Sequence, residues 1–347
     1  MGADRDSDAW VDSSVCHDGR LSASQITQWR EQGFTLVHDL LPVNLLKQVA
    51  LSAAQAFPAA NSQDAAAITD FGSDQRFVFP SQSQACNALT LHHNLLTAIS
   101  ALLDVAVEQL RLTQSDVWVK YGRPPGQADR DNADQRMHCD YPNHTLTHPP
   151  PWQHPEAVEL IVYLADWQTC GGATAVVPRR GPADPAYPWP ITQTPGVGDL
   201  AYVNDRDRAE RYLATHAPDV ARFRATHLYP REVQARYRFG SILFYRHDTW
   251  HRGTPVELGQ RRIVANLTFR KADSEWVNVL HPGWSWSMYQ VSQITEQLIA
   301  KATVAQRAVL GFPPPGSAYW TEQTITAVAQ RYAAHGIDMS PYRKALA

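Results

Sequence analysis

Cysteine is scarce in this sequence. The 347 residues include only 4 cysteines, and no two of them form a C-x-x-C pair. A chain of this length with so few cysteines is not a disulfide-stabilised scaffold, so we expect a reducing, cytoplasmic compartment. The N-terminus is polar and acidic and has no apolar segment of the kind found in secretory signals.

Two further absences narrow the choice of partners. No run of about 18 apolar residues occurs, so we expect neither a transmembrane helix nor a membrane partner. No run of lysine and arginine occurs, and the net charge of −3 gives no reason to expect a nucleic acid. With 44% hydrophobic and 19% charged residues, the chain has the composition of an ordinary soluble enzyme. A small molecule is therefore the partner we expect, and the oligomeric state stays open.

Helix and strand signals alternate in the first third of the chain. Residues 1–20 have the composition of a flexible tail. A serine-capped helix is predicted up to Gln32, where Gly33 ends it. The strand candidate FTLVHD and an amphipathic helix follow, and a further helix is predicted over Leu89–Leu103.

From about residue 115 to residue 270 the sequence changes to short β-prone runs. They are rich in valine, isoleucine, tyrosine and phenylalanine and are separated by glycine, proline and aspartate. The runs are SDVWVKYG, AVELIVYLAD, ATAVVP, DLAYVN, GSILFYR and RRIVANLTFRK. Many short strands predict an antiparallel sandwich or barrel, and the lack of helices recurring between them argues against a Rossmann sheet.

The chain turns helical again from about Ser287. Because no clean linker separates the parts, we expect one domain over residues 21–347. It would comprise a β core at about 115–270 and a helical C-terminal extension at about 287–347.

The stretch RMHCDYPNHT contains the first candidate metal ligands. Successive side chains of a strand alternate between its two faces, so His138 and Asp140 would project together while Cys139 points away, packed and inert. An imidazole and a carboxylate that converge in this way suit a divalent metal. A facial triad of two histidines and one carboxylate needs one more histidine from a distant part of the chain.

His251, in GSILFYRHDTWHRGTPV, is the best candidate for that third ligand. Arg262 follows eleven residues later, at the start of a predicted strand, where its guanidinium could grip a carboxylate bidentately. Arg261 is the alternative, although strand alternation puts Arg262 on the polar face. His247 and His251 are spaced like a zincin pair, but the H-E-x-x-H pattern is not met.

The combination of HCD, WHRG and an arginine eleven residues after the last histidine resembles the phytanoyl-CoA dioxygenase family. The entry LSASQITQWREQGFTLVHDLLP and the segment TCGGATAVVPRRG are also similar to that family, although its usual Pro-Gly-Ser-His ending reads PRRG here. The resemblance covers roughly residues 21–270. It implies an iron(II)- and 2-oxoglutarate-dependent oxygenase on a double-stranded β-helix, the cupin-like jelly roll, flanked by helices.

The resemblance also implies roles for individual residues. His138, Asp140 and His251 would bind Fe(II), and Arg262 would hold the far carboxylate of 2-oxoglutarate. The remaining coordination sites would serve 2-oxoglutarate and O2. Oxidative decarboxylation to succinate and CO2 would then drive hydroxylation of a small molecule. The presence of Asp140 favours hydroxylation, or a related desaturation or ring formation, over halogenation.

Several other assignments are open. Lys120 is either a second contact to 2-oxoglutarate or a lysine at a sheet edge. Tyr141 and Asn143 follow the HCD motif closely enough to be substrate contacts. Trp152, in the long loop that follows, is either a lid residue that contacts the substrate or only an anchor. Two rival functions also remain: a zinc hydrolase with the same ligands, which would give the arginine no evident role, and a non-catalytic jelly-roll binding or sensing protein.

Overall fold

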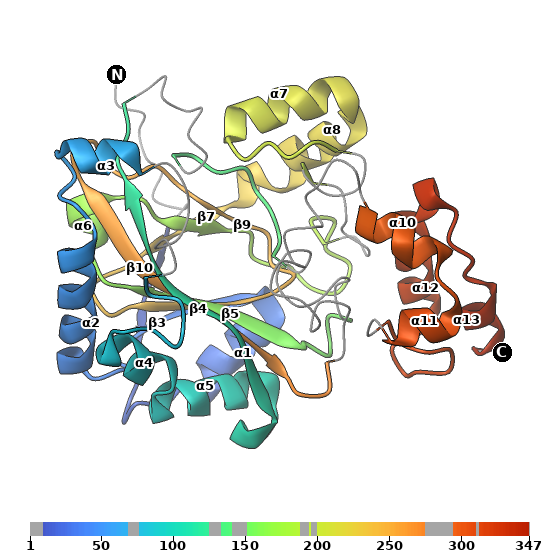
Figure 1. The fold of residues 1–347 in the computed structure, drawn as a ribbon, viewed down its shortest axis with the longest axis horizontal. Helices are drawn as coiled ribbons and strands as arrows, with labels where there is room; N and C mark the ends of the chain where they lie inside the picture. The colour runs from blue at the N-terminus through green and yellow to red at the C-terminus, as the bar shows by residue number, and fades with distance from the viewer. Residues whose placement is uncertain are drawn as a thin grey trace.

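The computed structural model describes residues 10–68, 76–124, 133–140, 151–187, 194–195, 200–274, 294–309 and 312–346. Two β-sheets form the centre of the molecule (Figure 1). The six-stranded sheet has the order β2 (Ser14–Val15), β3 (Phe34–His38), β8 (Ile242–Arg246), β5 (Ala157–Tyr163), β10 (Arg261–Lys271) and β4 (Leu110–Tyr121). The four-stranded sheet has the order β1 (Trp10–Asp12), β7 (Val233–Arg236), β6 (Thr174–Val176) and β9 (His251–Gly253).

From β4 onward the chain passes back and forth between the two sheets. After β4 in the large sheet, residues 133–140 run beside β9 of the small sheet, through isolated bridges. The chain then supplies β5 to the large sheet, β6 and β7 to the small one, and β8, β9 and β10 to the two in turn. One hydrophobic cluster combines Tyr163 and Leu243 of the large sheet with Val176 and Ala235 of the small one, so the inner faces of the sheets pack together.

The outer face of the large sheet is covered by helices from the N-terminal third of the chain. Alternation along β10 sends Ile263, Ala265 and Leu267 into this helical layer and Val264 between the sheets. The first helix begins at a capping box on Ser22 and ends at Gly33, whose φ of 89° is left-handed. The covering helices are α1 (Ala23–Gln32), α2 (Val43–Ala56), α4 (Gln84–Thr90) and α5 (His93–Leu103). The expected β core with flanking helices is therefore present.

The N-terminal segment differs from the flexible tail that its composition predicts. In the described part of residues 1–20, β1 pairs in parallel with β7, and β2 pairs in parallel with β3. The ring of Trp10 packs edge-on against Trp167 at 4.6 Å, and the Arg236 guanidinium lies over it. These long-range contacts order a stretch whose local composition is polar, so the tail prediction is wrong for residues 10–20.

The structure differs from the sequence prediction in three further places. The helix expected over Leu89–Leu103 is two helices, because the chain breaks at residues 91–92 between α4 and α5. The run DLAYVN forms no strand over its described residues 200–204. Between β6 and β7 stand two helices that the β-rich texture did not predict, α7 (Arg206–His216) and α8 (Pro218–His227).

The C-terminal helices form their own hydrophobic cluster. Tyr319 packs against this cluster and also against the cluster beneath the candidate ligand strands, which contains Met137 and Trp250. That one domain spans residues 21–347 stays a prediction. The helices of this part are α10 (Ile294–Lys301), α11 (Val304–Val309), α12 (Glu322–Arg331) and α13 (Ser340–Lys344). The remaining elements are α3 (Gln63–Ala67), α6 (Trp167–Cys170) and the 3-10 turns Val107–Gln109, Tyr229–Arg231 and Ala333–His335. Among the described residues, no helix combines the length and apolar character that crossing a bilayer requires.

Asp184 is a buried carboxylate whose loss should destabilise the fold. Arg231 donates two hydrogen bonds to it, at 2.6 and 2.7 Å, and the backbone N–H groups of Arg180 and Ala186 donate two more. Burial alone would raise the pKa of Asp184, but these donors outweigh it and lower the pKa from 3.8 to about 2. A carboxyl group with a depressed pKa stabilises the fold above its unfolded pKa, and this contribution disappears as the pH falls from about 4 toward 2.

We therefore expect Asp184→Asn to lower the free energy of unfolding by about 2 kcal/mol at neutral pH, and by much less near pH 2. Urea unfolding at both pH values measures the difference. Asp219→Asn is the matched control, because Asp219 pairs with Arg222 on the surface, where both side chains are largely exposed. Equal losses in the two variants, or a loss at Asp184 that does not depend on pH, would contradict this account.

Candidate metal centre

His138 and His251 face each other across two backbone hydrogen bonds. The N–H of each residue donates to the carbonyl oxygen of the other, at 2.9 and 2.8 Å. The pairing continues where the N–H of Gln135 donates to the carbonyl of Gly253. This register brings the two imidazole rings to a centroid distance of 4.4 Å. Residues that are 113 positions apart in the chain are thus fixed side by side by the backbone alone.

Asp140 completes the cluster two residues after His138. Its Oδ2 lies 2.9 Å from Nε2 of His251, and its Oδ1 lies 3.5 Å from Nε2 of His138. One ligand atom from each of the three side chains falls within 4.8 Å of the others. In the described part of the chain this is the one group of three or more His, Cys, Asp or Glu residues so arranged. The structure therefore brings the three predicted ligands together.

Both histidines are oriented so that Nε2 points into the cluster. Nδ1 of His138 lies 3.0 Å from the carbonyl oxygen of Arg136, and Nδ1 of His251 lies 3.0 Å from that of Thr249. A carbonyl only accepts, so each Nδ1 carries a hydrogen and each Nε2 faces the cluster. Nε2 of His251 lies within hydrogen-bond distance of the Asp140 carboxylate, and it can bind a metal once it has lost any proton it shares with that group. The contact at Nδ1 is the usual means of fixing a metal-binding tautomer.

Burial and the neighbouring carboxylate set the charges of these groups. Burial, reinforced by the nearby His251, lowers the pKa of His138 from 6.5 to about 3. Burial also opposes a charge on His251, but the adjacent Asp140 carboxylate outweighs it and raises that pKa. His138 is therefore already neutral and ready to bind a divalent cation, whereas binding at His251 would displace a proton from its contact with Asp140. Two imidazole nitrogens and one carboxylate oxygen, all on one side, fit the facial triad of non-haem iron.

Behind Asp140 lies a second buried polar group that the sequence did not reveal. The Tyr245 hydroxyl donates to Oε2 of Glu159 at 2.9 Å and lies 3.3 Å from Oδ2 of Asp140. His247 Nδ1 lies 2.8 Å from the other Glu159 oxygen. His247 therefore contacts Glu159, the partner of Tyr245. His247 and His251 do not lie on a common helix, so the geometry excludes the zincin pattern.

Arg262 and Lys120 form a buried cationic pair in the same space between the sheets. They are register partners on β10 and β4. The Arg262 guanidinium donates to the carbonyl of Gly172, and Lys120 Nζ donates to the carbonyl of Thr254 at 2.7 Å. Burial and then the adjacent Arg262 charge lower the pKa of Lys120 well below its usual range. The two basic side chains lie side by side, and the acceptors just named are carbonyl oxygens and carry no full negative charge. Such a pair suits the binding of an anion between them.

Lys120 also lies close to the strand of a candidate ligand. A Cβ added to Gly253 would come within 3.1 Å of Lys120 Nζ. Gly253 is two residues beyond His251 on β9, which is about 7 Å along a strand. The same Cβ would lie 2.5 Å from Oε1 of Gln135, which accepts a hydrogen bond from the Gly253 N–H, so a glycine lets Gln135 and Lys120 both approach this backbone. Arg261 instead donates to the carbonyls of Phe57 and Pro58 in the helical layer, so it points away from this space.

The other predicted residues lie as follows. Cys139 is buried in the cluster beneath the ligand strands, with its thiol toward the carbonyl of Asp248 and its pKa raised well above the usual range, mainly by burial. The prediction that it is packed and faces away is confirmed. Trp152 is half-buried, and the Arg246 and Arg179 guanidinium groups lie 3.7 and 3.9 Å from its ring centre. Its surroundings are those of an anchored ring. Tyr141 and Asn143 lie outside the described residues.

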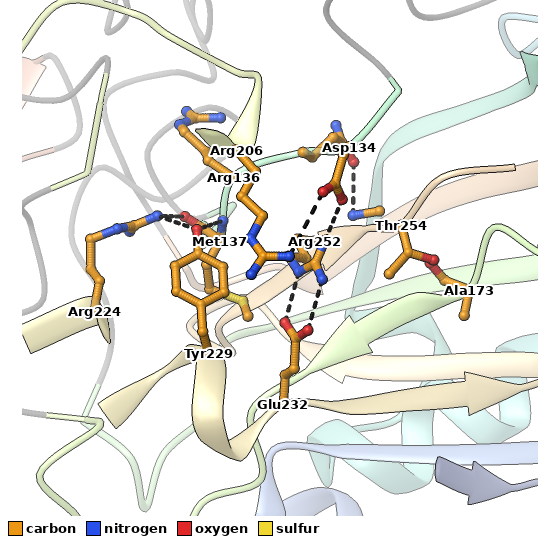
Figure 2. A network of polar contacts seen from close by, with 12 residues as sticks. Asp134, Arg136, Met137, Ala173, Arg206, Arg224, Tyr229, Glu232, Arg252 and Thr254 are labelled. Atoms are coloured by element: carbon orange, nitrogen blue, oxygen red, sulfur yellow. Dashed lines mark hydrogen bonds and ion pairs between the residues drawn. The ribbon is translucent and has the colours of Figure 1, made fainter. Parts of the chain in front are cut away.

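Two buried arginines stabilise the segments that carry His138 and His251. Arg252, next to His251, donates two hydrogen bonds of 2.7 Å to Glu232 and also pairs with Asp134, so its guanidinium is held from both sides (Figure 2). Arg224 of α8 is fully buried and donates to the carbonyl of Met137, next to His138. Sequence reasoning missed these residues. The alternation of acidic and basic residues over 205–224 is the signal that could have found the helices that carry Arg224.

No family model and no curated protein matches this chain. Among solved structures, the chain is similar to the non-heme alpha ketoglutarate dependent carbocyclase SnoK from nogalamycin biosynthesis, at 17% identity over 74% of this chain and 86% of SnoK, with a TM-score of 0.47. It is also similar to EvdO2 from Micromonospora carbonacea var. aurantiaca, at 16% identity over 73% and 91% of the two chains, with a TM-score of 0.48. A third is EctD from S. alaskensis, at 16% identity over 79% and 86%, with a TM-score of 0.48.

At such identities, and with TM-scores below 0.5, these likenesses are distant. They assign neither a substrate nor a reaction to this chain, and the functional conclusion depends on the residues of its own site.

Proposed function

We propose that this protein is a non-haem Fe(II)- and 2-oxoglutarate-dependent dioxygenase of the phytanoyl-CoA dioxygenase type that hydroxylates a small molecule. The single observation that carries the proposal is the convergence of His138, Asp140 and His251 within 4.8 Å, in a space that also holds the buried cations Arg262 and Lys120. A metal site alone is compatible with many enzymes. A metal site beside two buried basic side chains matches a co-substrate that carries two carboxylates.

The two-sheet core supports the same proposal. The chain alternates between the sheets from β4 to β10, with neighbours β4–β10–β5–β8 in one sheet and β9–β6–β7 in the other. This arrangement is what a double-stranded β-helix requires, and we assign the core to that class. The candidate ligands come from residues 133–140 and β9, which lie on the inner side facing β5 and β8.

Each part of the site has a role in this reaction. His138, Asp140 and His251 would hold iron, and Arg262 would bind the distal carboxylate of 2-oxoglutarate, with Lys120 beside it. Iron and 2-oxoglutarate, when bound, supply oxidation by O2 coupled to decarboxylation to succinate and CO2. The chain positions them and keeps water away.

Spectroscopy of the anaerobic protein tests the proposal. Addition of Fe(II) and 2-oxoglutarate should produce the weak visible charge-transfer band of a 2-oxo acid chelated to iron, and admission of air should release succinate. A zinc hydrolase would instead retain Zn(II) tightly and give no such band. No band and no succinate in protein that has demonstrably bound Fe(II) would overturn the proposal, whereas a band without turnover would point to a binding or sensing protein.

A further inference from the structure

Asp140 differs from the two histidines in how it is held. The histidines are fixed by hydrogen bonds to backbone carbonyls next to them in sequence. The Asp140 carboxylate is instead contacted by a side chain from the opposite sheet, Tyr245 of β8, which is also hydrogen-bonded to Glu159 of β5. We propose that Tyr245 and Glu159 are positioning residues that set the orientation of the Asp140 carboxylate toward the metal. This inference rests on the proposed metal centre and goes beyond its three ligands.

The register between β5 and β8 creates the arrangement. Glu159 and Tyr245 are directly paired on adjacent strands, and both side chains point inward between the sheets. Tyr245 reaches both carboxyl groups through one hydroxyl, at 2.9 Å from Glu159 and 3.3 Å from Asp140. Its ring also lies 4.5 Å from that of His251. Tyr245 is thus in contact with two of the three candidate ligands and ligates nothing itself.

Glu159 holds the Tyr245 hydroxyl in place. It is 4% exposed and accepts the hydrogen bond from Tyr245 at 2.9 Å. Because the same hydroxyl lies 3.3 Å from Asp140, Glu159 helps to fix the atom that contacts the candidate ligand.

His247 holds Glu159 from the far side. Its Nδ1 lies 2.8 Å from Glu159 Oε1, and its side chain is 1% exposed. The contacts therefore run in the order His247, Glu159, Tyr245 and Asp140. Tyr245 contacts Oδ2 of Asp140, the oxygen that lies 2.9 Å from Nε2 of His251, so it can fix the position of that oxygen within the cluster.

Binding of Co(II) alone tests the inference, because Co(II) reports both affinity and coordination through its visible spectrum. Tyr245→Phe removes one hydroxyl and keeps the ring, and Glu159→Leu removes the acceptor that holds this hydroxyl. Each should weaken Co(II) binding, Tyr245→Phe by about 10–100-fold, as loss of a metal ligand's hydrogen-bond partner generally does. Each should also shift the visible bands. Glu159→Gln should stay close to wild type, because its amide oxygen can still accept from Tyr245.

Tyr237→Phe is the matched control, since Tyr237 also loses a buried phenol hydroxyl but its oxygen contacts the carbonyl of Gly171 and the thiol of Cys170. Thermal unfolding of the metal-free variants measures any general loss of stability, and if Glu159→Leu does not fold, Tyr245→Phe decides. Wild-type Co(II) affinity and spectrum in Tyr245→Phe would overturn the inference while leaving the metal centre intact. Failure of the wild-type protein to bind Co(II), or binding that His251→Ala does not weaken, would overturn both proposals.

Discussion

Replacing His251 by alanine should abolish the charge-transfer band and succinate release, and should weaken Fe(II) binding by more than about 100-fold. Loss of a hydrogen-bond partner of a metal ligand weakens metal binding by about 10–100-fold. Loss of the ligand itself should cost more, which sets this lower bound. The backbone hydrogen bonds between residues 138 and 251 do not involve the imidazole, so the strands should stay paired. Anaerobic titration with Fe(II), followed by single-turnover measurement of succinate, gives both quantities.

The chain offers a matched control for this variant. His154 lies in the segment that follows the HCD motif and is exposed, so His154→Ala changes the same residue type without touching the cluster. It should bind Fe(II) as the wild type does. Undiminished iron binding in His251→Ala, or an equal loss in His154→Ala, would place the metal elsewhere.

The second large effect is expected at Arg262. Arg262→Leu should raise the dissociation constant for 2-oxoglutarate by roughly 30-fold to several thousand-fold. Removing one member of a buried, hydrogen-bonded ion pair costs about 2–5 kcal/mol. The dissociation constant of Arg262→Lys should fall between those of the wild type and Arg262→Leu, because an ammonium group keeps the charge but lacks the two parallel N–H donors of a guanidinium. Titration of the anaerobic Fe(II) protein with 2-oxoglutarate, followed through the charge-transfer band, measures the constant.

Arg261→Leu separates this role from a general need for arginine at the start of β10. Arg261 points to the carbonyls of Phe57 and Pro58, so its loss should affect stability and leave 2-oxoglutarate affinity unchanged. Iron affinity should be unaltered in both variants. The assignment of Arg262 fails if Arg261→Leu weakens 2-oxoglutarate binding and Arg262→Leu does not.

The parts of this site that could be predicted are those that local geometry dictates. The spacing of His138 and Asp140 follows from strand alternation, and the same rule separates Arg262 from Arg261 and turns Cys139 away. The approach of His251 required a resemblance to a known motif, since nothing near it in sequence indicates a partner 113 residues away.

Other parts depend on long-range register and could not be read from local sequence. Glu159 sits inside AVELIVYLAD, where a single acidic residue in an apolar strand gives no hint of its neighbour. Only the pairing of β5 with β8 puts it opposite Tyr245. Likewise, Trp10 is ordered by Trp167 and Arg236, which are distant in the chain. The α7 and α8 helices are charged and short of apolar residues, so their helical period is weak.

The candidate site depends on both sheets. His138 and His251 are tied to each other by backbone hydrogen bonds at the small sheet, whereas the Asp140 carboxylate also contacts Tyr245 of the large one. Local opening of either sheet would therefore disrupt the arrangement of the candidate ligands, so the packing that stabilises the core also keeps the site assembled.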